Sequence, residues 1–227
     1  MIKSTIQLYI DTATDTLKAI GRGPAVWLFS IALPFIVGGF AILLSPLGII
    51  GRFAAGFVMI TMAGAYLFLV GQSLERTNPL GFSIIKDSIG NHLWDVMGIF
   101  FLHWILSLGF AYGSLPDMVF ILVTIVIFIL FNPWPEVIYQ DRRTGSMDIL
   151  VRSFRFMQAN GPEWVVPHLL LVALGFGSLI PGPTGVLQMG MGVASLLLFH
   201  PVMVFRGALF RNLNKGSRRS RAWQSRF

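Results

Sequence analysis

Residues 24–44 read PAVWLFSIALPFIVGGFAILL, and no charged residue occurs between Arg22 and Arg52. A helix needs about 20 apolar residues to cross a bilayer, so this uncharged stretch is too long for one crossing. The turn-forming sequence Ser45-Pro46-Leu47-Gly48 divides it. We therefore expect one membrane span at residues 24–44 and a second at residues 53–74.

The rest of the chain repeats this pattern. Further runs with almost no charge cover residues 96–113, 118–139 and 164–205, and Pro181-Gly182-Pro183-Thr184-Gly185 divides the last run in two. Of the 227 residues, 55% are hydrophobic and 12% are charged, whereas soluble domains carry about 25% charged residues. The sequence predicts an all-α integral membrane protein with six transmembrane helices.

The basic residues indicate topology and not nucleic-acid binding. The net charge is +7, but Lys and Arg lie between the apolar runs, so no nucleic-acid partner is expected. Of the 17 Lys and Arg residues, all except Arg52 precede the first span, follow an even-numbered span or lie in the tail. By the positive-inside rule, both termini face the cytoplasm. The absence of cysteine excludes disulfides and Cys-ligated metal centres.

The spans form three similar units, at about 1–76, 77–143 and 144–212, and a basic tail follows at 213–227. Each unit begins with a segment whose apolar residues recur at helical spacing, which is typical of an amphipathic helix in the membrane interface. Because each unit crosses twice, the three share one orientation and allow a pseudo-threefold axis along the membrane normal. The apolar residues of these segments are Ile6, Ile10, Ala13, Leu17 and Ile20; Phe82, Ile85, Ile89 and Leu93; and Leu150, Phe154 and Met157, and the tryptophan after each segment is Trp27, Trp94 or Trp164.

One region carries a family resemblance. It has a proline before a Gln-Asp exit, a basic amphipathic segment with Arg-Ser that ends in Ala-Asn, and a later proline: Pro135, Gln140-Asp141, residues 147–160 and Pro167. Residues 130–170 thereby resemble bacterial YciC-like six-span inner-membrane proteins, and the membrane domain joined to some glycerophosphodiester phosphodiesterases has a similar layout. Glu136 departs from the family pattern, in which an apolar residue is expected. The resemblance implies a bacterial inner-membrane location and an association with envelope lipids, and it brings no catalytic residues.

Glu136 and Asn132 are candidates for a polar site in the membrane. Glu136 lies about one turn before the end of the fourth span, after Asn132-Pro133-Trp134-Pro135. Prolines at this point leave backbone carbonyls free, and polar groups in hydrocarbon are functional candidates. The carboxylate can bind a cation or a lipid amine, or relay a proton. The structural alternative, which we expect, is an ion pair with Arg142 or Arg143.

Three histidines are further candidates. His168 and His200 both lie toward the cytoplasmic side of their spans, whereas His103 lies deeper in the third span. A shared metal or haem site requires ligands at one depth. Histidines that hydrogen-bond between helices are the alternative, and we expect no cofactor.

Small residues one helical turn apart predict close helix contacts, at Gly51 and Ala55 and at Gly190 and Ala194. The sequence contains no HExxH, no phosphate-binding GxxxxGK[ST], no GxSxG and no pair of carboxylates within one span. We therefore expect a protein that is not an enzyme.

The carboxy-terminal segment is basic and aromatic. It holds six positive residues and no acid from Arg211 to Phe227, and such a segment is attracted to anionic lipid headgroups or to an acidic partner. A disordered stop-transfer tail is the alternative. The candidate contact residues are Arg211, Lys215, Arg218, Arg219, Arg221, Trp223 and Arg226.

Together these features favour an accessory or scaffold protein of the inner membrane that contacts membrane lipids and another membrane protein. A second hypothesis is a transporter or channel for a lipid or small amphiphile, with Glu136 near the inner mouth of a central cavity. A third hypothesis, a haem or pigment subunit of an electron-transfer complex, depends on the histidines alone.

Overall fold

The computed structural model describes residues 2–112, 117–141, 145–179 and 185–215. All regular elements in these residues are helical. They are α1 (Ile2–Arg22), α2 (Pro24–Leu44), the 3-10 turn η1 (Ser45–Leu47), α3 (Gly48–Glu75), α4 (Ser83–Ser88), α5 (Leu93–Tyr112), α6 (Asp117–Phe131), α7 (Trp134–Asp141), α8 (Ser146–Leu179) and α9 (Gly185–Asn214).

Four stretches of the described helices are long and apolar enough to cross a membrane: Pro24–Glu75, Leu93–Phe110, Met118–Asp141 and Gly192–Asn214. The first stretch contains the whole α2–η1–α3 hairpin. In the most apolar 18-residue window of each stretch, only 6–39% of the residues are buried inside the protein. Large exposed apolar faces of this kind are stable in lipid and not in water. In length and composition these helices are compatible with a multi-pass membrane protein.

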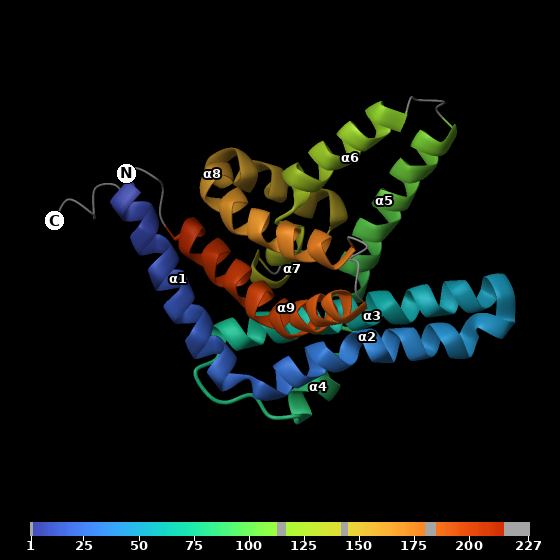
Figure 1. Cartoon of the computed structure of the whole chain (residues 1–227), viewed down its shortest axis with the longest axis horizontal. Coiled ribbons are helices and arrows are strands. Elements are labelled where there is room, and N and C mark those ends of the chain that lie inside the picture. Colours follow the sequence, from blue (N-terminus) through green and yellow to red (C-terminus); the bar gives the residue numbers. More distant parts are fainter. Residues whose placement is uncertain (1, 113–116, 142–144, 180–184, 216–227) are drawn as a thin grey trace.

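The helices form arms that diverge from a common base. Figure 1 shows α2 and α3 side by side in one arm, and α5 and α6 in a second arm that points in another direction. Large exposed side chains such as Phe35, Ile42, Phe101 and Phe128 lie on these arms. The buried core lies where the arms meet, and it includes Val70 and Leu74 of α3, Val137 and Ile138 of α7, and Val204 and Leu209 of α9.

The first hairpin closes as the sequence predicts, and α2 has the predicted bounds. Gly48 follows η1 with a φ of 59°, a conformation that favours glycine. Gly51 packs against the backbone of Leu44, where a larger residue would overlap the carbonyl. The close helix contact predicted at Gly51 is therefore confirmed. For Gly190, in contrast, no atom of the described residues lies within 4 Å of the place where a Cβ would lie, so the described part of the chain shows no close contact there.

α1 packs on the end of α9 through its polar and small side chains. Thr12 and Thr16 are buried, and the Thr12 hydroxyl accepts a hydrogen bond from the Asn212 amide over 3.3 Å. The predicted apolar stripe faces the other way, with Leu17 71% exposed. A helix that exposes its apolar face beside membrane-spanning arms fits the predicted position in the membrane interface.

The Tyr9 hydroxyl attaches α1 to α8. It donates to the Glu163 carbonyl over 2.8 Å. Burial raises the pKa of Tyr9, and the Glu163 carboxylate raises it further, so this hydroxyl keeps the proton that it donates.

The three predicted units differ in structure. The second interfacial segment forms only the six-residue α4. The third was expected at residues 147–160, separate from a span that starts at residue 164, but α8 runs through both as one 34-residue helix. The three tryptophans also differ, because Trp94 is 73% exposed while Trp164 is 1% exposed.

The last helix carries the core to the end of the described chain. α9 reaches Asn214, and Leu213 is buried in the core.

Candidate functional site

A break in the fourth predicted span creates the candidate site. α6 ends at Phe131 and α7 begins at Trp134, because Pro133 and Pro135 lack the amide protons that a continuous helix requires. The carbonyl of Asn132 is thereby available to another partner. Glu136 lies in the first turn of α7 and is completely buried.

Arg206 of α9 neutralises Glu136. Its Nε donates to Glu136 Oε1 over 2.8 Å, and its Nη2 donates to Oε2 over 2.9 Å. The same Nη2 donates to the free Asn132 carbonyl over 2.9 Å. Such a two-point guanidinium–carboxylate pair is strong and directional. The Glu136 side chain is 0% exposed, and the Arg206 side chain is 11% exposed.

The expectation that Glu136 is paired is therefore confirmed, and its partner in the described residues is Arg206. Arg142 and Arg143 lie outside the described residues, and the observed partner is 70 residues away in sequence. A search near Glu136 along the chain cannot find Arg206, because only the packing of α7 on α9 brings the two together.

Trp164 of α8 covers the ion pair. The Arg206 Cζ lies 5.6 Å from the centroid of the Trp164 ring, a distance typical of cation–π contacts. The Trp164 Nε1 donates to the Asn132 Oδ1 over 3.2 Å. Asn132 thus accepts with its backbone from α9 and with its side chain from α8. We call Asn132, Glu136, Trp164 and Arg206 the buried clamp.

His168 borders the buried clamp. Its ring lies 4.6 Å from the Trp164 ring, and its Nδ1 is 2.6 Å from the Trp164 carbonyl. A carbonyl only accepts, so Nδ1 carries the proton of this hydrogen bond. The buried Nε2 has no hydrogen-bond partner in the described part of the chain.

His200 is held separately. Its Nδ1 lies 3.1 Å from the hydroxyl of Tyr66 on α3, and its Nε2 also lacks a hydrogen-bond partner among the described residues. His103 is exposed on α5. His200 thus bonds another helix, as the interhelical alternative predicts, whereas His168 bonds a carbonyl of its own helix. No group of three His, Cys, Asp or Glu side chains that could hold a metal occurs in the described residues.

Tyr139 and Gln140 pack α7 against α3 and α9. The Gln140 amide donates to the Gly207 carbonyl over 2.8 Å. Gly71 and Gly207 lie directly against the Tyr139 side chain, so the ring fits only because both positions lack a side chain. Four residues of this polar region were not predicted from the sequence: Tyr66, Tyr139, Trp164 and Arg206. For Arg206, the available clue was a charge that follows an uncharged run directly.

Part of the predicted tail belongs to the body. Arg211 donates to the Leu74 carbonyl over 2.8 Å and to the Asp15 carboxylate over 3.2 Å, so it joins α9 to α3 and α1. Lys215 is exposed. The other candidate contact residues, Arg218, Arg219, Arg221, Trp223 and Arg226, lie outside the described residues.

No protein-family model, curated protein or solved structure matches this chain.

Proposed function

We propose that this chain is a non-enzymatic accessory or scaffold protein of the bacterial inner membrane, which contacts envelope lipids and other membrane proteins through its arms. The observation that carries the proposal is the buried clamp. The carboxylate best placed for transport or chemistry is already bound at both oxygens by a guanidinium of the same chain.

A carboxylate that carries protons or cations must exchange its partner during each cycle. Glu136 would first have to leave Arg206, which also holds the Asn132 carbonyl and contacts Trp164. Separating such a pair inside a protein costs several kcal/mol. The clamp therefore suits a fixed joint that holds α6, α7, α8 and α9 together.

The arms supply the contact surfaces. Their exposed side chains are apolar over most of their length, and contact with lipid tails or another apolar helix leaves no polar group unsatisfied. In the proposed topology the chain crosses six times, as three like-oriented units, with both termini in the cytoplasm. The hairpin form of α2–α3 and the length of α8 support this count. The basic tail adds a contact with anionic headgroups or an acidic partner.

The transporter alternative requires a polar pathway, and the described spans provide little support for one. The hydroxyls of Thr61 and Ser107 donate to carbonyls four residues earlier in their own helices. These groups are satisfied without a water-filled channel. The remaining support for the haem alternative is the Nε2 atoms of His168 and His200, which have no hydrogen-bond partner among the described residues. An absorption spectrum of the purified protein tests this alternative directly.

One comparison tests the proposal. Native protein and a Glu136→Gln variant are expressed at equal levels, and the membrane proteins that copurify with each are quantified from native membranes. We expect one reproducible partner set in equal amounts for both, and no solute flux in proteoliposomes. Flux that depends on Glu136, or loss of cellular function at unchanged stability, would show that the carboxylate acts in transport.

A further inference from the structure

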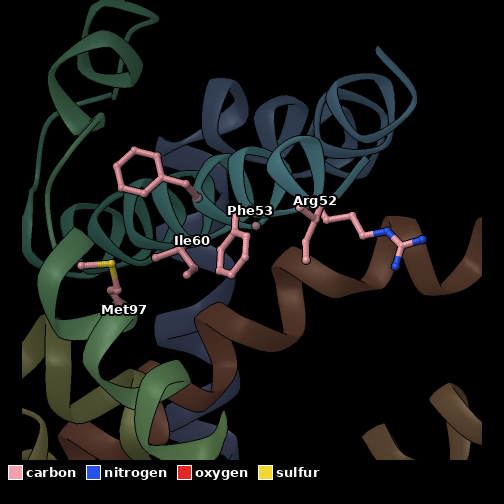
Figure 2. Close-up of a pocket in the computed structure, with 7 residues that line it drawn as sticks. Arg52, Phe53, Ile60 and Met97 are labelled. Carbon is pink, nitrogen blue, oxygen red and sulfur yellow. The ribbon is translucent and has the colours of Figure 1, made fainter. Parts of the chain in front are cut away.

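A crevice opens between α3 and α5, away from the buried clamp. It has a volume of about 460 Å³ and is lined by Ile49, Arg52, Phe53, Gly56, Phe57, Ile60 and Met97. This volume lies within the range of about 300–1,000 Å³ that is typical of small-molecule sites. Figure 2 shows Met97 of α5 at one end of the row and Arg52 at the other, with the guanidinium extending away from the apolar side chains.

The crevice is a consequence of how the two arms diverge. α5 starts close to α3, where the backbone at Asn91 and His92 touches Gly64. The two helices then separate, and no atom of the described chain lies within 4 Å of the place where a Cβ of Gly56 would lie. Phe53 is 77% exposed and Phe57 is 49% exposed. The result is an apolar wedge that is narrow at Ile60 and open toward Arg52.

The length of the wedge matches one leaflet of a bilayer. Arg52 and Ile60 are eight residues apart on α3, which corresponds to about 12 Å at a rise of 1.5 Å per residue. Half of the hydrocarbon core is about 15 Å thick. Arg52 also lies five residues after the end of the η1 turn, so a long flexible side chain there can extend to headgroup depth.

The charge of Arg52 indicates which ligand fits the crevice. Arg52 is exposed, and no ion pair to it occurs among the described residues. A guanidinium at headgroup depth pairs well with a phosphate, and the wedge below it offers only apolar atoms and glycine to a ligand. A partner helix would need an acid at this depth, whereas a phospholipid brings phosphate and acyl chain together.

We propose that this crevice binds one phospholipid of the leaflet nearest the α2–α3 turn, with an acyl chain along Phe53, Phe57 and Ile60 and the phosphate on Arg52. The inference rests on the proposed function, since it names one of the lipid contacts that a membrane scaffold makes. It deepens that function by assigning a specific site, in addition to the general contact of the arms with lipid.

Photolabelling tests the site. The full chain is reconstituted in vesicles that contain either an anionic phospholipid with a diazirine on one acyl chain or a diacylglycerol with the same labelled chain. Labelled peptides are then mapped by mass spectrometry. We expect labelling of α3 residues 48–62 and α5 residues 93–100, at a higher level for the phospholipid than for the diacylglycerol.

Two variants and two controls distinguish the effect of the Arg52 charge from the effect of the shape of the crevice. Arg52→Gln should lower phospholipid labelling about fivefold, the factor expected for one basic residue beside lipid phosphate, and leave diacylglycerol labelling unchanged. Gly56→Leu fills the wedge and should lower both. Gly39→Leu and Arg155→Gln make the same changes at exposed positions outside the crevice and should change neither.

Equal labelling by the two probes, or labelling that Gly56→Leu does not reduce, would overturn the proposal. So would a polypeptide cross-linked in the crevice in native membranes, since a protein would then be the occupant. Resistance to alkaline extraction is measured for every sample. A chain that is extracted refutes the proposed membrane function, whereas an inserted chain without crevice labelling refutes only the lipid site.

Discussion

Removing Arg206 should destabilise the protein more than removing the charge of Glu136. In Arg206→Met, the Glu136 carboxylate stays fully buried and loses both of its guanidinium hydrogen bonds. Breaking a buried ion pair from one side typically costs about 3–5 kcal/mol. In Glu136→Gln, Arg206 keeps the Asn132 carbonyl and the Trp164 ring and retains some exposure. Glu136→Gln should then lower the free energy of unfolding by about 1–3 kcal/mol.

The double variant Glu136→Gln with Arg206→Met measures the interaction itself. Because the first change removes the charge that the second would leave unpaired, the double variant should be more stable than the sum of the single effects by about 2 kcal/mol. Free energies of unfolding are measured by far-UV circular dichroism in mixed micelles as SDS is increased. Arg155→Met, on the exposed side of α8, is the control and should change stability by less than about 0.5 kcal/mol.

Two results would refute this reasoning. One is an Arg206→Met variant that is no less stable than Glu136→Gln. The other is strict additivity in the double variant, since additive effects would mean that the two side chains do not interact energetically.

Three further predictions follow from packing, charge and topology. Gly207→Ala places a methyl group against Leu74 and Tyr139 and should lower the free energy of unfolding by about 1–3 kcal/mol in the same SDS titration. The control Gly190→Ala, at an exposed position, should leave the stability unchanged or slightly raised. Equal effects of the two substitutions would mean that Gly207 is not tightly packed. Deletion of residues 216–227 should leave the body folded and inserted, but loosen association with anionic vesicles at about 0.1 M salt more than at 1 M, where the Debye length is about 3 Å; unchanged, salt-insensitive association would assign the contact to the arms. Reporter fusions should show export at the three odd-numbered turns, and cytoplasmic activity at two of them would overturn the proposed topology: Gly48, Ser114 and Gly182.

The apolar helices could be predicted because their determinants are local. The charge spacing and the turn at residues 45–48 predicted the bounds that α2 has in the structure. The prolines at 133 and 135 predicted free backbone carbonyls near Glu136, and Arg206 binds one carbonyl in this region, that of Asn132. The continuous α8 was not predicted, because Pro162 removes the hydrogen bond to the carbonyl of residue 158 and its ring crowds that carbonyl, which usually kinks or ends a helix. Gln158 is exposed, so water or headgroups can satisfy that carbonyl.

The members of the buried clamp could not be predicted in the same way. Asn132, Trp164 and Arg206 come from three different helical regions, and their separation of 32 to 74 residues carries no periodic pattern. Arg206 reads in sequence as a residue at the cytoplasmic exit of the last span. Only the contact of α7, α8 and α9 shows that it turns back toward Glu136.

We propose that the exposed faces of the arms contact lipid and that the base forms the protein core. The chain contains no cysteine, so single cysteines can carry nitroxide spin labels without removing any native thiol. Labels at Phe35, Phe101 and Phe128, which are 54–69% exposed, are compared with a label at the fully buried Val70 in reconstituted vesicles. Collision rates with oxygen, which is enriched in lipid, and with a water-soluble nickel chelate are measured by electron paramagnetic resonance. We expect high oxygen and low nickel collision rates at the three arm positions and low rates of both at Val70. Nickel collision rates above the oxygen rates at the arm positions would show that these faces contact water and not lipid.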